Sequence, residues 1–295
     1  MIEAEVRSLD VGGVTLRVRS WNPQGAPPSP RFVLVHGLAS NALTWERVAS
    51  SVAARGYAVT SLDQRGHGRS EKPDGPYDIP AVVGDLDGLL SLLGLRDVVL
   101  VGQSWGGNVA LEYAFLHPDR LRGLICVDGG TIDLQARWPE WEDCKAVLAP
   151  PRLEGTPVAD WERMLRDAYP AWDDSGIAAT MENMEVLPDG TVRPWLSFDR
   201  HLRVLRGLWE HRPAERYGGL SVPILLVPVL LPAGDSWTTN KRAGIERAQA
   251  AIPRSRVVWM EGDHDIHVQR PRELAAVMLE ALPWFEAARS PGARP

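Results

Sequence analysis

The stretch Gly102-Gln103-Ser104-Trp105-Gly106-Gly107 lies between an apolar run at residues 98–101 and a helical pattern over residues 106–117. A chain that turns this sharply from a strand into a helix forces the turn residue into a strained backbone. The flanking residues must then be glycine, because a Cβ at those positions would clash. G-x-S-x-G alone is weakly specific, but with a strand before it and a helix after it, the pattern predicts that Ser104 is a nucleophile.

Short apolar segments alternate with segments of helical length on both sides of this turn. The apolar segments do not alternate with polar residues, which is typical of strands in a sheet covered on both faces. The pattern predicts an α/β fold with a doubly wound, mostly parallel sheet of eight strands. Strands are expected at residues 3–8, 15–20, 32–35, 57–62, 98–101, 121–127, 222–231 and 256–260, and helices at 42–55, 79–93, 106–117, 238–251 and 272–288.

The alternation stops near Thr131 and resumes after Gly218. We therefore expect a core domain of residues 1–130 and 219–295, with a helical cap of residues 131–218 inserted between strands 6 and 7. The cap would cover the strand ends, where α/β sheets bind their ligands. Half of the chain's twelve tryptophans lie in this segment. Trp138 and Trp141 are candidates for substrate binding, and most of the others are expected to fill the small core of the cap.

A serine nucleophile requires a general base, which is expected at the end of a late strand. Of the seven histidines, only His264 and His267 follow the last predicted strand. His264 lies nearer to the end of that strand and is the preferred base. His267 is the alternative and would otherwise be a partly exposed residue at the start of a helix.

An acyl-transfer site also needs two N–H donors for the oxyanion. The first is the backbone N–H of Trp105, at the start of the helix, where the dipole favours negative charge. The second is expected from the loop His36-Gly37-Leu38 after the strand at residues 32–35, and Leu38 is the candidate. His36 is expected mainly to shape this loop, and His36 and Gly37 to border the substrate site.

The carboxylate that orients the base has two candidates. Asp235 follows the predicted strand at residues 222–231 and precedes His264 by 29 residues, so it is the first choice. Pro228 lies inside that strand and cannot donate to a sheet ladder, so a bulge or an extended loop must accommodate it. Asp128, at the end of the strand at residues 121–127, is the runner-up.

Four stretches together resemble the α/β-hydrolase superfamily, and in particular its members with a cap, such as bacterial esterases. They are residues 36–38, residues 62–70 (Leu-Asp-Gln-Arg-Gly-His-Gly-Arg-Ser), the Ser104 turn and residues 262–271. The resemblance implies a Ser–Asp–His triad with His264 as base, and a structural role for the stretch around Asp63 and His67.

The resemblance also implies a reaction class. Haloalkane dehalogenases and epoxide hydrolases of this fold carry Asp at the turn, whereas Ser104 favours acyl transfer. The expected activity is that of a serine carboxylesterase on small to medium apolar esters. Hydrolysis of a lactone, amide, thioester or C–C bond, or perhydrolysis, would use the same residues. A weakly catalytic receptor on this fold is the alternative outside the enzymes.

Composition restricts the partners of the chain. With 295 residues, 44% apolar residues and a net charge of −6, it resembles an ordinary globular protein without a basic surface for nucleic acid. The apolar run at residues 222–231 is too short to cross a membrane, and the first residues do not resemble a signal peptide. Cys126 and Cys144 form neither a disulfide framework nor a zinc site. We expect a cytoplasmic monomer or homodimer that needs no metal or cofactor and acts on a small molecule.

Overall fold

A mostly parallel sheet forms the centre of the protein in the computed structural model, which describes residues 2–25, 29–230 and 236–289. Within these residues, the main sheet has eight strands in the order β1-β2-β4-β3-β5-β6-β10-β12. β2 pairs in antiparallel with both of its neighbours, β1 and β4, and all neighbours from β4 to β12 pair in parallel. The predicted fold class is confirmed. The strands are β1 (Glu5–Asp10), β2 (Thr15–Trp21), β3 (Arg31–Val35), β4 (Val59–Leu62), β5 (Val98–Gln103), β6 (Leu121–Val127), β10 (Ile224–Val227) and β12 (Ser255–Val257).

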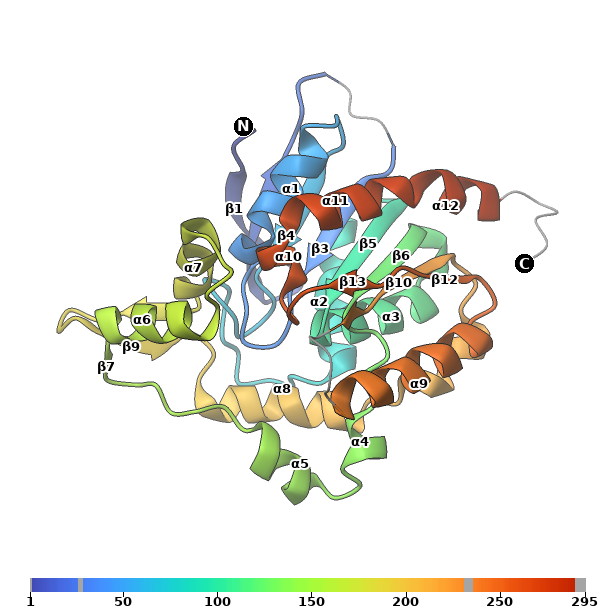
Figure 1. Cartoon of the computed structure of the whole chain (residues 1–295). Helices are drawn as coiled ribbons and strands as arrows, with labels where there is room; N and C mark the ends of the chain where they lie inside the picture. The colour runs from blue at the N-terminus through green and yellow to red at the C-terminus, as the bar shows by residue number, and fades with distance from the viewer. Residues whose placement is uncertain (1, 26–28, 231–235, 290–295) are drawn as a thin grey trace.

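The central strands are apolar throughout because each contributes side chains to two separate cores. In β5, Val98 and Leu100 belong to one buried cluster, and Val99 and Val101 belong to the other. The first cluster includes side chains of α2, α3 and α9, and the second those of α1, α11 and α12, so helices cover both faces of the sheet (Figure 1). The core helices are α1 (Glu46–Ala53), α2 (Ile79–Leu92), α3 (Trp105–Leu116), α9 (Ser236–Ala251), α10 (Ile266–Gln269), α11 (Pro271–Glu280) and α12 (Leu282–Arg289).

Two prolines interrupt elements that were expected to be continuous. The expected strand at residues 222–231 divides at Pro228 into β10 and β11 (Val229–Leu230), and β11 pairs with β13 (Met260–Glu261) in a separate small sheet. Pro283 lies in the first turn of α12, where a proline is tolerated, so the closing helix is divided into α11 and α12. Both interruptions follow from the N–H that proline lacks.

The segment between β6 and β10 extends from the carboxyl end of the sheet (Figure 1). The expectation of a wholly helical cap is wrong in one respect, because a three-stranded antiparallel sheet β7-β9-β8 lies within it. A Pro-Asp-Gly turn connects β8 to β9, with Gly190 at φ +80° and the Thr191 N–H bonded to Asp189. The elements are α4 (Leu134–Arg137), α5 (Trp141–Leu148), β7 (Thr156–Pro157), α6 (Val158–Ala168), α7 (Asp174–Met181), β8 (Met184–Val186), β9 (Thr191–Pro194) and α8 (Phe198–Glu210).

The described helices include none with both the length and the apolar character that crossing a bilayer requires.

Candidate active site

Ser104 occupies the sharp turn between β5 and α3 with φ +52° and ψ −125°. A non-glycine residue with this backbone is strained, and such strain tends to persist where the surrounding structure enforces it. Here the Ser104 N–H donates to the Val127 carbonyl at 2.9 Å, and the Ser104 carbonyl accepts from Gly107 N–H at 2.9 Å. Neighbouring strand and helix thus fix the turn from both sides, as the sequence predicted.

The glycines around Ser104 allow β5, α3 and the loop after β3 to approach closely. A Cβ on Gly106 would lie 2.3 Å from the His36 carbonyl oxygen and 2.6 Å from that of Val35. A Cβ on Gly102 would lie 2.1 Å from the Gly106 carbonyl oxygen. These obstructions are backbone atoms, which cannot rotate away as a flexible side chain could.

We expect Gly106→Ala to lower the free energy of unfolding by about 1–3 kcal/mol, because the added methyl group must displace the β3 backbone. Urea denaturation measures the change. Gly84→Ala is the matched control: Gly84 lies exposed inside α2 with open space around its Cβ position, so alanine there should raise stability by up to about 1 kcal/mol. Equal effects of the two substitutions would contradict the packing argument.

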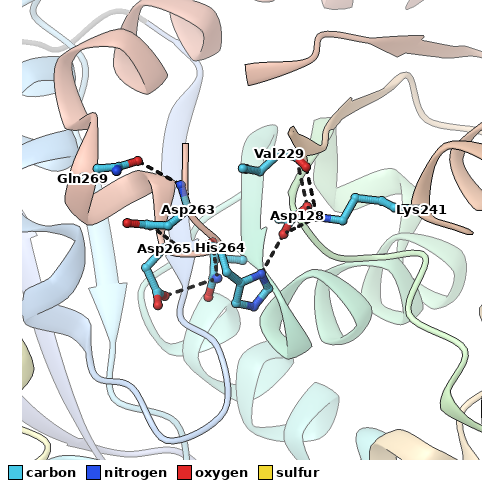
Figure 2. Close-up of polar contacts among 8 residues, drawn as sticks. Asp128, Val229, Lys241, Asp263, His264, Asp265 and Gln269 are labelled. Atoms are coloured by element: carbon cyan, nitrogen blue, oxygen red, sulfur yellow. Dashed lines mark hydrogen bonds and ion pairs between the residues drawn. The ribbon is translucent and has the colours of Figure 1, made fainter. Parts of the chain in front are cut away.

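His264, in the loop after β13, meets a carboxylate at the end of β6. Its Nδ1 lies 2.6 Å from Asp128 Oδ2 (Figure 2). The Asp128 side chain is only 4% exposed, whereas that of His264 is half exposed. Because Gln103 pairs with Val127 in the β5–β6 register, the neighbouring residues Ser104 and Asp128 leave the sheet side by side. A histidine held by a buried carboxylate at the edge that carries the serine is the arrangement of a catalytic triad.

Asp128, the runner-up from the sequence, is therefore the carboxylate that contacts His264. Asp235, the first choice, lies outside the described residues. His267, the alternative base, is buried against the Trp45 ring with Nε2 3.2 Å from Thr44 Oγ1. Burial lowers the pKa of His267 to about 3, so it remains neutral.

Asp128 and His264 each shift the pKa of the other. Burial tends to raise the pKa of Asp128, but the hydrogen bond and charge of His264 and the ammonium group of Lys241 outweigh it and hold the pKa below its ordinary value. Burial tends to lower the pKa of His264, but the hydrogen bond to Asp128 and the charges of Asp265 and Asp128 raise it above its ordinary value. Asp128 is therefore charged, and the Nδ1 proton of His264 points to it.

Two further groups bind Asp128, and the sequence did not reveal either. Lys241 Nζ donates to Oδ1 at 2.8 Å and to Oδ2 at 3.0 Å, and the Val229 N–H donates to Oδ1 at 3.0 Å (Figure 2). Lys241 is one of several charged residues in α9, and nothing in the periodicity of that helix singles it out.

Gln103 connects the turn to the loop that carries the base, a role that the sequence also did not reveal. Its side-chain Nε2 donates to the His264 carbonyl at 3.1 Å. The same amide lies 3.4 Å from Asp265 Oδ1. Gln103, which precedes Ser104, thus connects the Ser104 turn to the backbone of His264 by a hydrogen bond.

The loop of His36, Gly37 and Leu38 lies against the Ser104 turn. A Cβ on Gly37 would lie 3.1 Å from the Ser104 Cβ. Among the described residues, no acceptor is bonded to the backbone N–H of Leu38 or of Trp105. Both donors are thus available for an oxyanion, which is the role predicted for them.

Hydrogen bonds of His36, Gln64 and Asp63 shape the loops that follow β3 and β4. His36 is fully buried: its Nε2 accepts from the Gln64 N–H at 3.0 Å, and its Nδ1 lies 2.7 Å from the Gly37 carbonyl. Burial lowers its pKa, so the ring is neutral. Asp63 accepts from the N–H groups of Ala42 and Arg69, which join the loops after β3 and β4. His36 and Asp63 therefore support the loops structurally.

A cavity of about 490 Å³ lies between these loops and the cap. It is bordered by Leu38, the predicted oxyanion donor, and by Asp265, the neighbour of the predicted base. Its tryptophans are Trp161 and Trp172, and Trp172 Nε1 also donates to Asp263 in the base loop at 2.8 Å. The other aromatic and apolar lining residues include Leu148, Leu165, Tyr169, Met184, Leu196, Phe198 and Val268.

His36 and Gly37, which were expected to border the substrate site, are not among the residues that line this cavity. The prediction that Trp138 and Trp141 bind substrate is likewise not supported, because neither lines it. Both pack against the core beneath α8, where Trp209 Nε1 donates to the Trp138 carbonyl at 2.7 Å and the Trp141 and Trp209 rings meet edge to face. The segment between β6 and β10 has tryptophans both against the core and along the cavity. The sequence could not show which tryptophans pack against the core and which line the cavity.

Comparison with known proteins yields relatives along almost the whole chain. Epoxide hydrolase A of Mycobacterium tuberculosis is 27% identical, over 95% of this chain and 98% of that protein. The 2-(acetamidomethylene)succinate hydrolase of Mesorhizobium japonicum is 28% identical, over 90% of each. A crystal structure of E-2-(acetamidomethylene)succinate hydrolase superposes with a TM-score of 0.76 at 24% identity, over 94% of this chain and 98% of that one.

These relatives support hydrolase activity but differ in the bond that they cleave. A sequence model described as the alpha/beta hydrolase fold matches residues 30–271, from the residue before β3 to the first residue of α11. This match covers most of the chain and includes the Ser104 turn, Asp128 and His264. The chain belongs to the alpha/beta hydrolase fold family.

Proposed function

We propose that the protein is a serine hydrolase that cleaves carboxylic esters of small to medium apolar substrates through an acyl-enzyme. The observation that carries the proposal is the contact of 2.6 Å between His264 and the buried Asp128, at the sheet edge where Ser104 is held in its strained turn. A serine becomes an effective nucleophile when an adjacent base takes its proton, and the base is effective when a third group fixes its tautomer.

In the proposed reaction, Ser104 Oγ attacks the ester carbonyl carbon while His264 Nε2 takes the hydroxyl proton. The backbone N–H groups of Leu38 and Trp105 stabilise the oxyanion. The tetrahedral intermediate collapses, the C–O bond to the alcohol breaks, and His264 returns the proton to the departing alkoxide. Water, deprotonated by His264, then attacks the acyl-serine, which releases the acid and restores the Ser104 hydroxyl.

The serine argues against the epoxide chemistry named for the Mycobacterium tuberculosis relative. An epoxide opened by a carboxylate leaves an ester on the enzyme, which water can hydrolyse at the carbonyl. An epoxide opened by Ser104 would leave an ether, which water does not cleave under the same conditions. Turnover through Ser104 therefore requires an acyl group.

The charges around the cavity favour an uncharged substrate. Its described lining contains no Lys or Arg, and its carboxyl groups are those of Glu154 and Asp265. Its two histidines are neutral, because burial lowers the pKa of His201 to about 4 and holds the pKa of His67 well below its ordinary value. A carboxylate in this cavity would find no cation to offset its desolvation. The Mesorhizobium japonicum relative is named for a succinate, and we expect this protein to prefer uncharged esters.

A substrate panel tests the proposal. p-Nitrophenyl esters of graded acyl length are compared with a lactone, an anilide, an epoxide and an ester that carries a free carboxylate. We expect the highest kcat/KM for an uncharged ester and no epoxide hydrolysis. Hydrolysis of the epoxide, or of the anilide or lactone in preference to every ester, would contradict the proposed bond type.

The pH dependence follows from the base. The active form is neutral His264, and its pKa is raised above the ordinary value of 6.5. Activity should therefore be complete above this raised pKa and be lost as the pH falls through it. We expect the acid limb of kcat/KM to have its midpoint above pH 6.5, measured with an ester whose own ionisation does not change between pH 5 and 9. A midpoint well below pH 6.5 would contradict the assignment of His264.

A further inference from the structure

Asp128 is bound by a lysine as well as by the candidate base. Lys241, in the second turn of α9, places Nζ between both Asp128 oxygens, at 2.8 and 3.0 Å, and also donates to the Val229 carbonyl at 3.0 Å. Its side chain is 22% exposed. All three acceptors of this ammonium group lie at the carboxyl ends of β6 and the β10–β11 segment.

Each Asp128 oxygen has more than one donor. Oδ1 accepts from Lys241 and from the Val229 N–H, and Oδ2 accepts from Lys241 and contacts His264 Nδ1 (Figure 2). Asp128 itself has a positive φ of 43°, which is uncommon for a residue other than glycine. Lys241 and Val229 thus hold the carboxylate in one orientation, with Oδ2 directed to the base.

We propose that Lys241 is a positioning residue that orients Asp128 toward His264 and partly neutralises it, so that the base remains available at lower pH. The inference rests on the proposed function, because it assigns to Lys241 an effect on the Asp128–His264 pair.

The charge balance gives the direction of the effect. The groups whose charges act on His264 are Asp128 from β6, Lys241 from α9 and Asp265 from the base loop. Asp263, in the same loop, acts on Asp265. His267 in α10 is neutral. The carboxylates favour the imidazolium form, and Lys241 is the cation that opposes them. Without Lys241, the same carboxylates would hold the proton on His264 more strongly.

The experiment compares Lys241→Met with the wild type across the pH range. The reporter is the rate at which a fluorophosphonate probe modifies Ser104, because this reaction needs the same base and does not depend on the natural substrate. We expect the acid limb of the labelling rate to move to higher pH by about one unit. The loss of rate should therefore be larger at pH 6 than at pH 9, whereas a purely structural loss would be the same at every pH.

Two controls make the comparison specific. Lys241→Arg retains the charge and should leave the acid limb within a few tenths of a unit of the wild type. Arg242→Met removes the neighbouring cation of α9, which lies over the Trp259 ring instead, and should not move the limb. An unshifted limb in a folded Lys241→Met protein, or an equal shift in Arg242→Met, overturns the inference. Absence of Ser104 labelling in the wild type would instead overturn the proposed function.

Discussion

Ser104→Ala is expected to lower kcat by at least about 10⁴-fold, because the acyl-enzyme cannot form without the hydroxyl. Activity that survives would reflect binding and oxyanion stabilisation alone. The fold should be retained, because alanine can adopt the backbone that serine already adopts at φ +52° and the described side chain makes no hydrogen bond within the protein. Steady-state hydrolysis of the preferred ester, together with the melting temperature, measures both effects.

Ser51→Ala is the control for Ser104→Ala. Ser51 lies on α1, and its hydroxyl donates to the Arg47 carbonyl of the same helix at 2.7 Å. Its removal should leave kcat within about twofold of the wild type. If a folded Ser104→Ala protein retained more than a hundredth of the wild-type kcat, Ser104 would not be the nucleophile.

Asp128→Asn is expected to lower kcat by about 10⁴-fold. An asparagine amide can donate to Nδ1 of His264 and so favour the wrong tautomer, in which the proton is on Nε2. A protonated Nε2 cannot accept the proton of the Ser104 hydroxyl. The substitution preserves shape, so the loss should appear in kcat with little change in KM. The same kinetic assay measures it.

Asp235→Asn is the matched comparison, because sequence reasoning alone placed the acid there. Since His264 Nδ1 is already bonded to Asp128, we expect Asp235→Asn to change kcat by less than about tenfold. The reverse order of effects would identify Asp235 as the orienting carboxylate and would contradict the pairing described above.

The parts of the fold that sequence patterns predicted are those fixed by local chemistry. The strands of the parallel sheet could be located because both of their faces are buried. The Ser104 turn could be located because a Cβ on its glycines would lie only 2.1 to 2.6 Å from backbone atoms, so no other residue fits there. An irregularity at Pro228 was also expected, since proline lacks the donor that a ladder needs, although its division of the segment into two strands was not.

The parts that were not predictable depend on contacts between distant segments. Asp128 and Asp235 both follow strands that end near His264, and spacing along the chain does not show which of them reaches Nδ1. Lys241 contacts Asp128 across 113 residues, and no local pattern records such a pair. The cap posed the same difficulty, because the choice between Trp141 and Trp161 as a lining residue depends on how its helices pack.

The most direct test of the account is the site and stoichiometry of covalent modification by a fluorophosphonate. We predict that one probe binds per chain, that peptide mapping places it on Ser104, and that hydrolysis of esters is lost in proportion to its incorporation. The account would be contradicted if wild-type protein, after incubation with excess probe, kept its full ester turnover and carried the probe either on no residue or on a residue other than Ser104.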